Sequence, residues 1–194
     1  MVFVVLRHGE SEWNKLNKFT GLTDVGLSEQ GKQEAIAAGM LLKNCFFDFI
    51  FCSQLKRTVH SAKIIADIQN NPAKIKPRNE FEERDYGTIT GKNKTELIEE
   101  HGKQQIMVWR RSFYQGPPGG ESLNAVAQRV GIGYDREIQF LLNDNRNVLL
   151  VAHGNSLRAL FVHLGIKNEK TIESFEIGTG VPIQVDVVNK TYKY

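Results

Sequence analysis

The chain has 194 residues, of which 41% are hydrophobic and 24% charged, values typical of a soluble globular domain with a substantial core. The formal net charge of +3 is too small to indicate binding to nucleic acid or to a membrane surface. Two cysteines without metal-ligand spacing, Cys45 and Cys52, fit a reducing compartment, and the N-terminal apolar run is too short for a signal peptide or a membrane span. We therefore expect a cytoplasmic protein.

Three apolar runs rich in β-forming residues predict buried strands, at residues 2–6 (VFVVL), 48–52 (DFIFC) and 147–152 (NVLLVA). Their hydrophobicity is continuous rather than alternating, which is typical of strands that are covered on both faces in a parallel sheet. The segment 181–188 (VPIQVDVV) alternates instead, and it predicts a further strand at an edge of the sheet.

Helical patterns lie between these strands. Residues 28–43 begin with a Ser N-cap, and residues 55–69 continue as a helix after the second strand. Residues 122–142 repeat apolar side chains at helical spacing, although Gly131 and Gly133 should each cost about 1 kcal/mol relative to alanine. Strands that alternate with helices predict a three-layer α/β fold, in which helices flank a mostly parallel sheet.

The segment from about 80 to 121 is less regular and rich in Glu, Arg and Lys. It contains two short helical patterns, at 94–101 and 104–113, followed by the turn-forming sequence GPPGG. We expect this segment to form a small helical cap over one edge of the sheet, within a single domain that spans residues 1–194.

The first and third predicted strands end in the same short motif, because His8-Gly9 and His153-Gly154 each follow an apolar run and precede a helix start. Ligands of an open α/β sheet bind beyond the carboxyl ends of its strands, where helix N-termini attract anions. Parallel strands would bring both histidines to that edge, and the two glycines would allow a ligand close to the backbone. A lone His-Gly pair is more often an exposed loop feature, but the matched pair favours one shared anion site.

One arginine is placed to reach the same edge. Arg57 lies in the first turns of the helix after the second strand, although a solvent-exposed role is equally compatible with that position. We expect structural roles for His60, His101 and His163.

Several motifs along the chain resemble those of the histidine phosphatase superfamily in their order. The resemblance extends from Val2 to about Val188, and it is strongest to the cofactor-dependent phosphoglycerate mutase branch. It implies the phosphoglycerate mutase-like fold. The motifs are LRHGESEWN (6–14), FTG (19–21), LSEQG (27–31), SQLKRT (53–58), EERDYG (82–87), GKNK (91–94), WRR (109–111), GESL (120–123) and VAHGNSLR (151–158).

The resemblance implies roles for the residues that would perform phosphoryl transfer. His8 would be the nucleophile that becomes phosphohistidine, and His153 would hold a phosphoryl oxygen. Glu83 would move a proton to and from the substrate, and it is the family motif that selects it, because spacing alone does not distinguish it from Glu82. The implied catalytic residues are Arg7, His8, Arg57, Glu83 and His153, with the two arginines clamping the phosphoryl group.

A ligand with two phosphates and a carboxylate needs a second anion-binding place, and the predicted cap contains the surplus cations Arg84, Lys94, Arg110 and Arg111. A solvated helix end is the alternative interpretation of the WRR motif. The resemblance implies that the far phosphate and carboxylate bind in the cap. The substrate-binding residues that it implies are Ser11, Asn14, Thr20, Gly21, Tyr86, Lys94, Arg110, Arg111, Gly154 and Asn155.

The implied reaction is the interconversion of 3-phosphoglycerate and 2-phosphoglycerate in glycolysis and gluconeogenesis, through a phosphohistidine. The implied cofactor is 2,3-bisphosphoglycerate as priming phosphate donor, without a metal; the partner is a small phosphorylated substrate, with neither nucleic acid nor membrane, and a homodimer is allowed. Only nine residues separate Arg111 from Glu121, and the tail after Val188 is short. A phosphatase of the same superfamily, acting on small phosphomonoesters, is therefore the alternative. The sequence disfavours a third interpretation, an inactive phospho-ligand-binding module on the same fold, because Arg7, His8, Arg57, Glu83 and His153 are all present.

Overall fold

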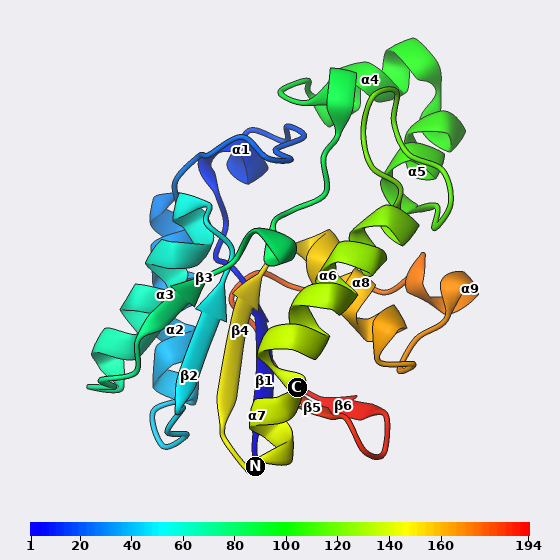
Figure 1. Cartoon of the computed structure of the whole chain (residues 1–194). Coiled ribbons are helices and arrows are strands. Elements are labelled where there is room, and N and C mark those ends of the chain that lie inside the picture. Colours follow the sequence, from blue (N-terminus) through cyan, green and yellow to red (C-terminus); the bar gives the residue numbers. More distant parts are fainter.

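A six-stranded sheet with the order β3-β2-β4-β1-β5-β6 lies at the centre of the computed structural model, which describes residues 1–194 (Figure 1). Neighbouring strands are parallel from β3 to β1, whereas β5 is antiparallel to both β1 and β6. The mostly parallel α/β sheet predicted from the sequence is thus confirmed. The strands are β1 (Phe3–Arg7), β2 (Phe49–Cys52), β3 (Ile75–Pro77), β4 (Val148–Ala152), β5 (Pro182–Asp186) and β6 (Thr191–Lys193).

The strand predicted at 181–188 does not lie at an edge, and that expectation was wrong. β5 lies between β1 and β6, because the chain turns back after Asp186 and the three-residue β6 pairs with its outer side. The alternation in its sequence has a different cause. Ile183 and Val185 are buried, whereas Pro182 and Gln184 are half-buried and Asp186 is exposed.

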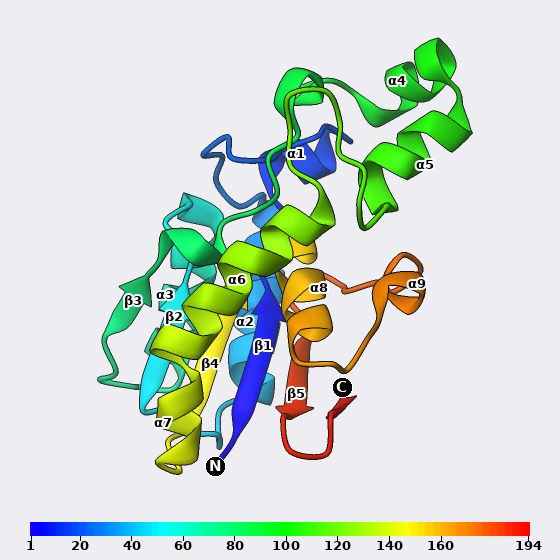
Figure 2. The same cartoon turned by 45° about the vertical axis from the view of Figure 1, so that its right-hand side comes forward.

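Helices cover both faces of the sheet (Figures 1 and 2). On one face, α2 (Glu29–Leu41) and α3 (Lys56–Ile68) pack on one set of alternate strand residues, which includes Val4 and Leu6. On the other face, α6 (Leu123–Glu137) and α8 (Gly154–His163) pack on the opposite set, which includes Val5. Burial on both faces explains the continuous apolar runs, since each buried apolar Å² contributes about 25 cal/mol.

The helix predicted at 122–142 is divided at Ile138 into α6 and α7 (Gln139–Asn143). The glycines of α6 have a packing reason, because a Cβ at Gly131 would lie 2.5 Å from His163 Nδ1 and one at Gly133 would lie 2.6 Å from Glu80 Cβ. Gly131 thus lets α6 approach α8, and Gly133 lets it approach the 3₁₀ helix η1 (Asn79–Phe81).

The cap consists mainly of α4 (Lys94–His101) and α5 (Lys103–Arg111), which lie beyond the carboxyl ends of the parallel strands (Figure 1). Its small apolar cluster of Phe19, Ile89, Leu97 and Ile106 joins the two helices to the loop after α1 (Glu12–Lys15) and to the 3₁₀ helix η2 (Gly87–Ile89). The remaining short helix is α9 (Glu169–Ile172). None of the helices is both long enough and apolar enough to span a membrane.

Candidate active site

The two histidines predicted to share one edge of the sheet lie side by side. His8 follows β1 and His153 follows the neighbouring parallel strand β4, with their ring centroids 4.9 Å apart and their planes at 67°. Both side chains are buried. The parallel register of β1 and β4 therefore brings two imidazoles together from positions that are 145 residues apart in the chain.

A cavity of about 120 Å³ opens beside His8, between the sheet and the cap. Basic residues dominate its wall, with seven cations (Arg7, Lys18, Arg57, Lys94, Arg110, Arg111, Arg158) and two carboxylates (Glu83, Glu176). The other lining residues are His8, Asn14, Phe19, Thr20, Gly21, Tyr86, Gly154 and Asn155. The cavity thus suits a compact ligand with several negative charges.

The hydrogen bond of His8 determines which of its ring nitrogens is free. Nδ1 lies 2.6 Å from the carbonyl oxygen of Gly9, which can only accept, so that Nδ1 carries the proton. The lone pair of a neutral ring is then on Nε2. Burial lowers the pKa of His8 well below its ordinary value, and the positive charges of Arg57 and Arg7 lower it further. His8 is therefore a neutral imidazole, the form that can act as a nucleophile.

His153 is held by two partners. Arg57 Nε donates to its Nδ1 at 3.3 Å, and its Nε2 lies 2.8 Å from the hydroxyl of Ser53. Because Nδ1 accepts, the proton of the neutral ring is on Nε2 and is donated to Ser53. Burial lowers the pKa of His153, followed by the charge of Arg57. An anion bound in the cavity beside the rings would oppose this effect by favouring an imidazolium.

The two arginines beside the histidines differ in how many donors they have free. Arg57 is almost fully buried, and besides the bond to His153 it donates to the carbonyl oxygens of Thr23 and Gly21, both at 2.8 Å. Arg7 donates from Nη1 to the carbonyl of Ile177 at 2.9 Å, but its buried Nε has no partner. Arg7 thus has a donor available to an anion, whereas Arg57 holds the loop that lines the cavity.

Of the two adjacent carboxylates, only Glu83 lines the cavity. Its Oε1 accepts the backbone N–H groups of Arg84 at 2.8 Å and of Asn155 at 3.2 Å. The second of these donors belongs to the first turn of α8, where the helix dipole favours a negative charge. The Glu83 carboxylate is therefore fixed by one oxygen at the end of the strand that carries His153.

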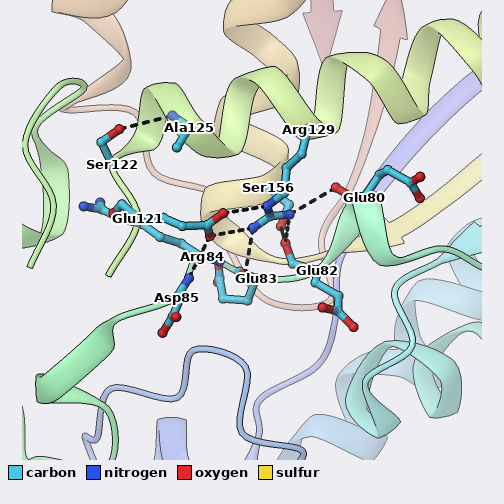
Figure 3. Close-up of polar contacts among 10 residues, drawn as sticks. All are labelled: Glu80, Glu82, Glu83, Arg84, Asp85, Glu121, Ser122, Ala125, Arg129 and Ser156. Atoms are coloured by element: carbon cyan, nitrogen blue, oxygen red, sulfur yellow. Dashed lines mark hydrogen bonds and ion pairs between the residues drawn. The ribbon is translucent and has the colours of Figure 1, made fainter. Parts of the chain in front are cut away.

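The segment that carries Glu83 is fastened to α6 by Arg129 (Figure 3). This guanidinium donates to the carbonyl oxygens of Glu80, Glu82 and Glu83 at 2.8–3.1 Å, and it forms a two-bond ion pair with Glu121. The hydroxyl of Ser156 at the start of α8 donates to the carbonyl of Glu82 at 2.6 Å. Two helices thus hold the backbone on either side of Glu83.

The cap side of the cavity contains the cations expected for a second anionic group. Lys94 begins α4, and Arg110 and Arg111 end α5, where the helix dipole favours positive charge. Burial lowers the pKa of Lys94 to about 8, and the charge of Arg110 is the next cause. Arg111 Nη1 is buried without a partner. Tyr86 lies beside them, and its hydroxyl accepts from Asn155 Nδ2 at 2.9 Å.

Three expectations differ from what the structure shows. Ser11 is fully buried and does not line the cavity, because its hydroxyl caps α1 by accepting the N–H of Asn14 at 3.2 Å. Arg84 is not a free cation for a ligand; it is fully buried and donates to three carbonyl oxygens of the 110–121 segment. Gly9 does not serve ligand access, because a Cβ there would lie 2.0 Å from the carbonyl oxygen of Gly31.

Gly154 has the open surroundings that were expected of it. A Cβ on this residue would lie 3.6 Å from both Arg7 Nε and Arg158 Nη1, which is the space between two guanidinium groups at the cavity wall. Asn14, Thr20, Gly21 and Asn155 also line the cavity.

Four of the lining residues were not predicted from the sequence as site residues. Arg158 lies within the motif at 151–158, one helical turn after Gly154, and this spacing alone could have predicted that it faces the same site. Lys18 precedes the FTG motif, and Phe19 is the first residue of that motif. Glu176 lies in the loop between α9 and β5 and has no local sequence signal.

Comparison with models of protein families shows the family of the chain. A model of the histidine phosphatase superfamily (branch 1) matches residues 3–190. The chain belongs to this superfamily. The family predicted from the resemblance of the motifs is thus confirmed.

Relatives of known name match most of the chain. The chain is 45% identical to the 2,3-bisphosphoglycerate-dependent phosphoglycerate mutase of Cytophaga hutchinsonii over 181 residues, an alignment that covers 93% of this chain and 85% of that protein. It is 43% identical over 183 residues to the protein of the same name from Bartonella henselae, covering 93% and 89%.

Solved structures of the superfamily share the fold. A mycobacterial glucosyl-3-phosphoglycerate phosphatase superposes with a TM-score of 0.84 at 24% identity, over 95% of this chain and 90% of that chain. The alpha-ribazole phosphatase from Shigella flexneri superposes with a TM-score of 0.82 at 23% identity, over 99% and 93%.

Proposed function

We propose that the chain is a 2,3-bisphosphoglycerate-dependent phosphoglycerate mutase, which interconverts 3-phosphoglycerate and 2-phosphoglycerate. Relatives of 43–45% identity are named for this activity. The observation that carries the proposal is the pair of buried guanidinium donors without partners, Arg7 Nε beside His8 and Arg111 Nη1 on the cap. An enzyme that hydrolyses a phosphomonoester needs an available donor only for its single phosphate. An enzyme whose ligand carries anionic groups at both ends needs available donors at each end.

In the first step, Nε2 of the neutral His8 attacks phosphorus in line, and the bond from phosphorus to the ester oxygen breaks as the N–P bond forms. Arg7 neutralises charge on the equatorial oxygens through its free Nε–H. His153, which takes up a proton from solvent as the dianion approaches, adds positive charge beside the phosphoryl oxygens. Arg57 maintains the positive potential and orients the ring of His153.

Glu83 is the proton carrier of this scheme. With Oε1 held by two backbone N–H groups, its other oxygen gives a proton to the leaving alkoxide in the first step and takes one from the attacking hydroxyl in the return step. In the return step, phospho-His8 gives its phosphoryl group to the free hydroxyl of a monophosphoglycerate, and the N–P bond breaks as the new P–O bond forms. The resulting bisphosphate reorients, and its other phosphoryl group then returns to His8.

The residues present fit the cofactor that this activity requires. When bound, 2,3-bisphosphoglycerate supplies the phosphoryl group that loads His8. Arg7 would hold the phosphate at the reacting end, and Lys94, Arg110 and Arg111 would hold the groups at the cap end. The buried hydroxyl of Thr20 also has no partner and is a further available donor.

Hydrolysis of small phosphomonoesters is the second candidate, and the lining of the cavity is the observation that favours it. Besides the sheet side, the cavity is covered by the cap and by the loop after α1, whereas residues of β5 and β6 do not line it. Some access of water to phospho-His8, and therefore some phosphate release, is expected beside the mutase reaction.

An enolase-coupled assay of 3-phosphoglycerate conversion tests the proposal. Activity should depend on added 2,3-bisphosphoglycerate, and Arg110→Ala or Arg111→Ala should lower the mutase rate by about 100-fold, as for the loss of a charged ligand contact. Hydrolysis of a simple monoester should fall much less. Arg136→Ala, which removes an exposed arginine of α6, is the matched control. A chain that hydrolyses monoesters and never converts 3-phosphoglycerate would be a phosphatase.

Two further predictions belong to this proposal. We expect a cytoplasmic enzyme and one folding unit for residues 1–194, and the proposal allows either a monomer or a homodimer. A single calorimetric unfolding transition would test the folding unit, and the sedimentation mass would distinguish a monomer from a homodimer.

A further inference from the structure

One carboxylate at the cavity wall, that of Glu176, forms ion pairs with two arginines of the same wall. Glu176 accepts from Arg111 Nη2 with one oxygen and from Arg158 Nη2, at 3.1 Å, with the other. Arg111 ends the cap helix α5, and Arg158 lies in α8 on the sheet. A single carboxylate thus bridges two guanidinium groups from opposite sides of the cavity.

The exposures of the three side chains differ. Those of Arg111 and Arg158 are 13% and 8% exposed, whereas that of Glu176 is 68% exposed. The two guanidiniums are therefore built into the wall, and the carboxylate reaches them from solvent on a loop. An ion pair with one solvated member is weak, so that a ligand anion can displace Glu176 at little cost.

The surroundings of the two arginines show that they need a negative charge. Burial, and after it the nearby charge of Arg111, lower the pKa of Arg158 to about 10, whereas Glu176 acts in the opposite direction. Arg111 also retains a buried Nη1 without a partner. Two crowded guanidiniums and an unused donor make a place for an anion that the Glu176 carboxylate fills only in part.

We propose that Glu176 is a tethered substitute for the ligand's second anionic group: it occupies the place between Arg111 and Arg158, and it lowers the affinity of the cavity for doubly anionic ligands by competing with them. This inference rests on the proposed function for the identity of the ligand. It assigns to Glu176 the role of a specificity-determining residue that makes release of the bisphosphate easier.

Calorimetric binding of 2,3-bisphosphoglycerate and of inorganic phosphate to the wild-type chain and to Glu176→Gln tests the inference without turnover. Glutamine keeps the shape and an acceptor oxygen but removes the charge. We expect the variant to bind the bisphosphate about three to five times more tightly, the gain that corresponds to removing one weak competing ion pair. Inorganic phosphate, which needs only the place beside His8, should change less than about twofold. Glu173→Gln, an exposed carboxylate of the same loop region, is the control and should change neither affinity.

A purely structural clasp between cap and sheet predicts the opposite sign, because its loss would loosen the cap and weaken binding of the bisphosphate. Unchanged or weaker binding by Glu176→Gln, equal tightening of both ligands, or no binding of the bisphosphate by either form would overturn the inference. The coupled assay on the wild-type chain judges the mutase proposal separately, since tighter binding by the variant can be observed in a chain that does not turn over.

Discussion

At the scale of single residues, burial determines the chemistry of the site. His8 and His153 are buried beside two arginines, so that both rings are neutral until an anion arrives. Neutrality frees Nε2 of His8 for attack, and the entering phosphoryl group then favours the protonated form of His153.

Phosphorylation of His8 gives the first prediction. Incubation with labelled 2,3-bisphosphoglycerate should leave an acid-labile, base-stable phosphate on the chain, because a phosphoramidate hydrolyses in acid. His8→Ala should remove both this label and the mutase activity. His60→Ala, which changes an exposed histidine of α3, should keep them. Label that persists in His8→Ala would assign the nucleophile to another residue.

The pKa of Lys94 gives the second prediction. Burial first, and then the charge of Arg110, lowers this pKa to about 8, whereas a bound anion would raise it. The ammonium is present below pH 8, so affinity for the bisphosphate should be constant there and should fall as the pH rises through 8, by up to about tenfold per pH unit. Lys94→Arg keeps its charge and should lose this fall. Identical pH profiles for the two forms would exclude Lys94 as the titrating group.

At the scale of elements, helices place catalytic groups that they do not themselves carry. Glu83 lies in an irregular segment, and Arg129 of α6 donates to the carbonyl groups of Glu80, Glu82 and Glu83 in that segment. This contact cannot be predicted from the sequence, because an arginine within an amphipathic helix has the pattern of a surface residue. Its partner Glu121 belongs to the GESL motif, which therefore has a structural reason in this chain.

Arg129→Met is the third prediction. It should lower kcat by about 10- to 100-fold with a smaller change in KM, because the Glu83 segment loses its fixed position while the cations of the cavity remain. The free energy of unfolding should fall by about 1–3 kcal/mol, since three carbonyls and a half-buried carboxylate lose their donor. Arg136→Met on the same helix is the control, because its partners Glu80 and Glu137 form surface pairs. An unchanged kcat for Arg129→Met would show that Glu83 keeps its position without the contact between its segment and Arg129 of α6.

The contact between α6 and α8 gives the fourth prediction. Gly131→Ala would place a methyl group 2.5 Å from the His163 ring and should lower the free energy of unfolding by about 1–3 kcal/mol, despite the better helix propensity of alanine. Adding His163→Ala should recover part of the loss, because the clash disappears. Gly26→Ala has no atom within 4 Å of the new Cβ and should be nearly neutral. Additive effects of the two substitutions would exclude the clash as the cause.

At the scale of the whole molecule, local patterns in the sequence predicted the central strands, the flanking helices and the shared edge of the two histidines. β3 and β6 were not predicted, because three residues give no periodicity and only pairing with a neighbouring strand makes them strands. Ser11 could not be assigned from sequence, since a helix cap and a ligand contact require the same residue type. Glu176 depends on long-range packing of a loop, which no local motif records.

The fate of the phosphoryl group on His8 tests the central claim most directly. The chain is loaded with labelled 2,3-bisphosphoglycerate, separated from free ligand and then mixed with 3-phosphoglycerate or with buffer alone. A mutase should return the label to bisphosphoglycerate at least about ten times faster than it releases inorganic phosphate, because the cap excludes water and the second anion site orients the acceptor. Release of the label as inorganic phosphate at the same rate with or without 3-phosphoglycerate would contradict the account and identify the chain as a phosphatase.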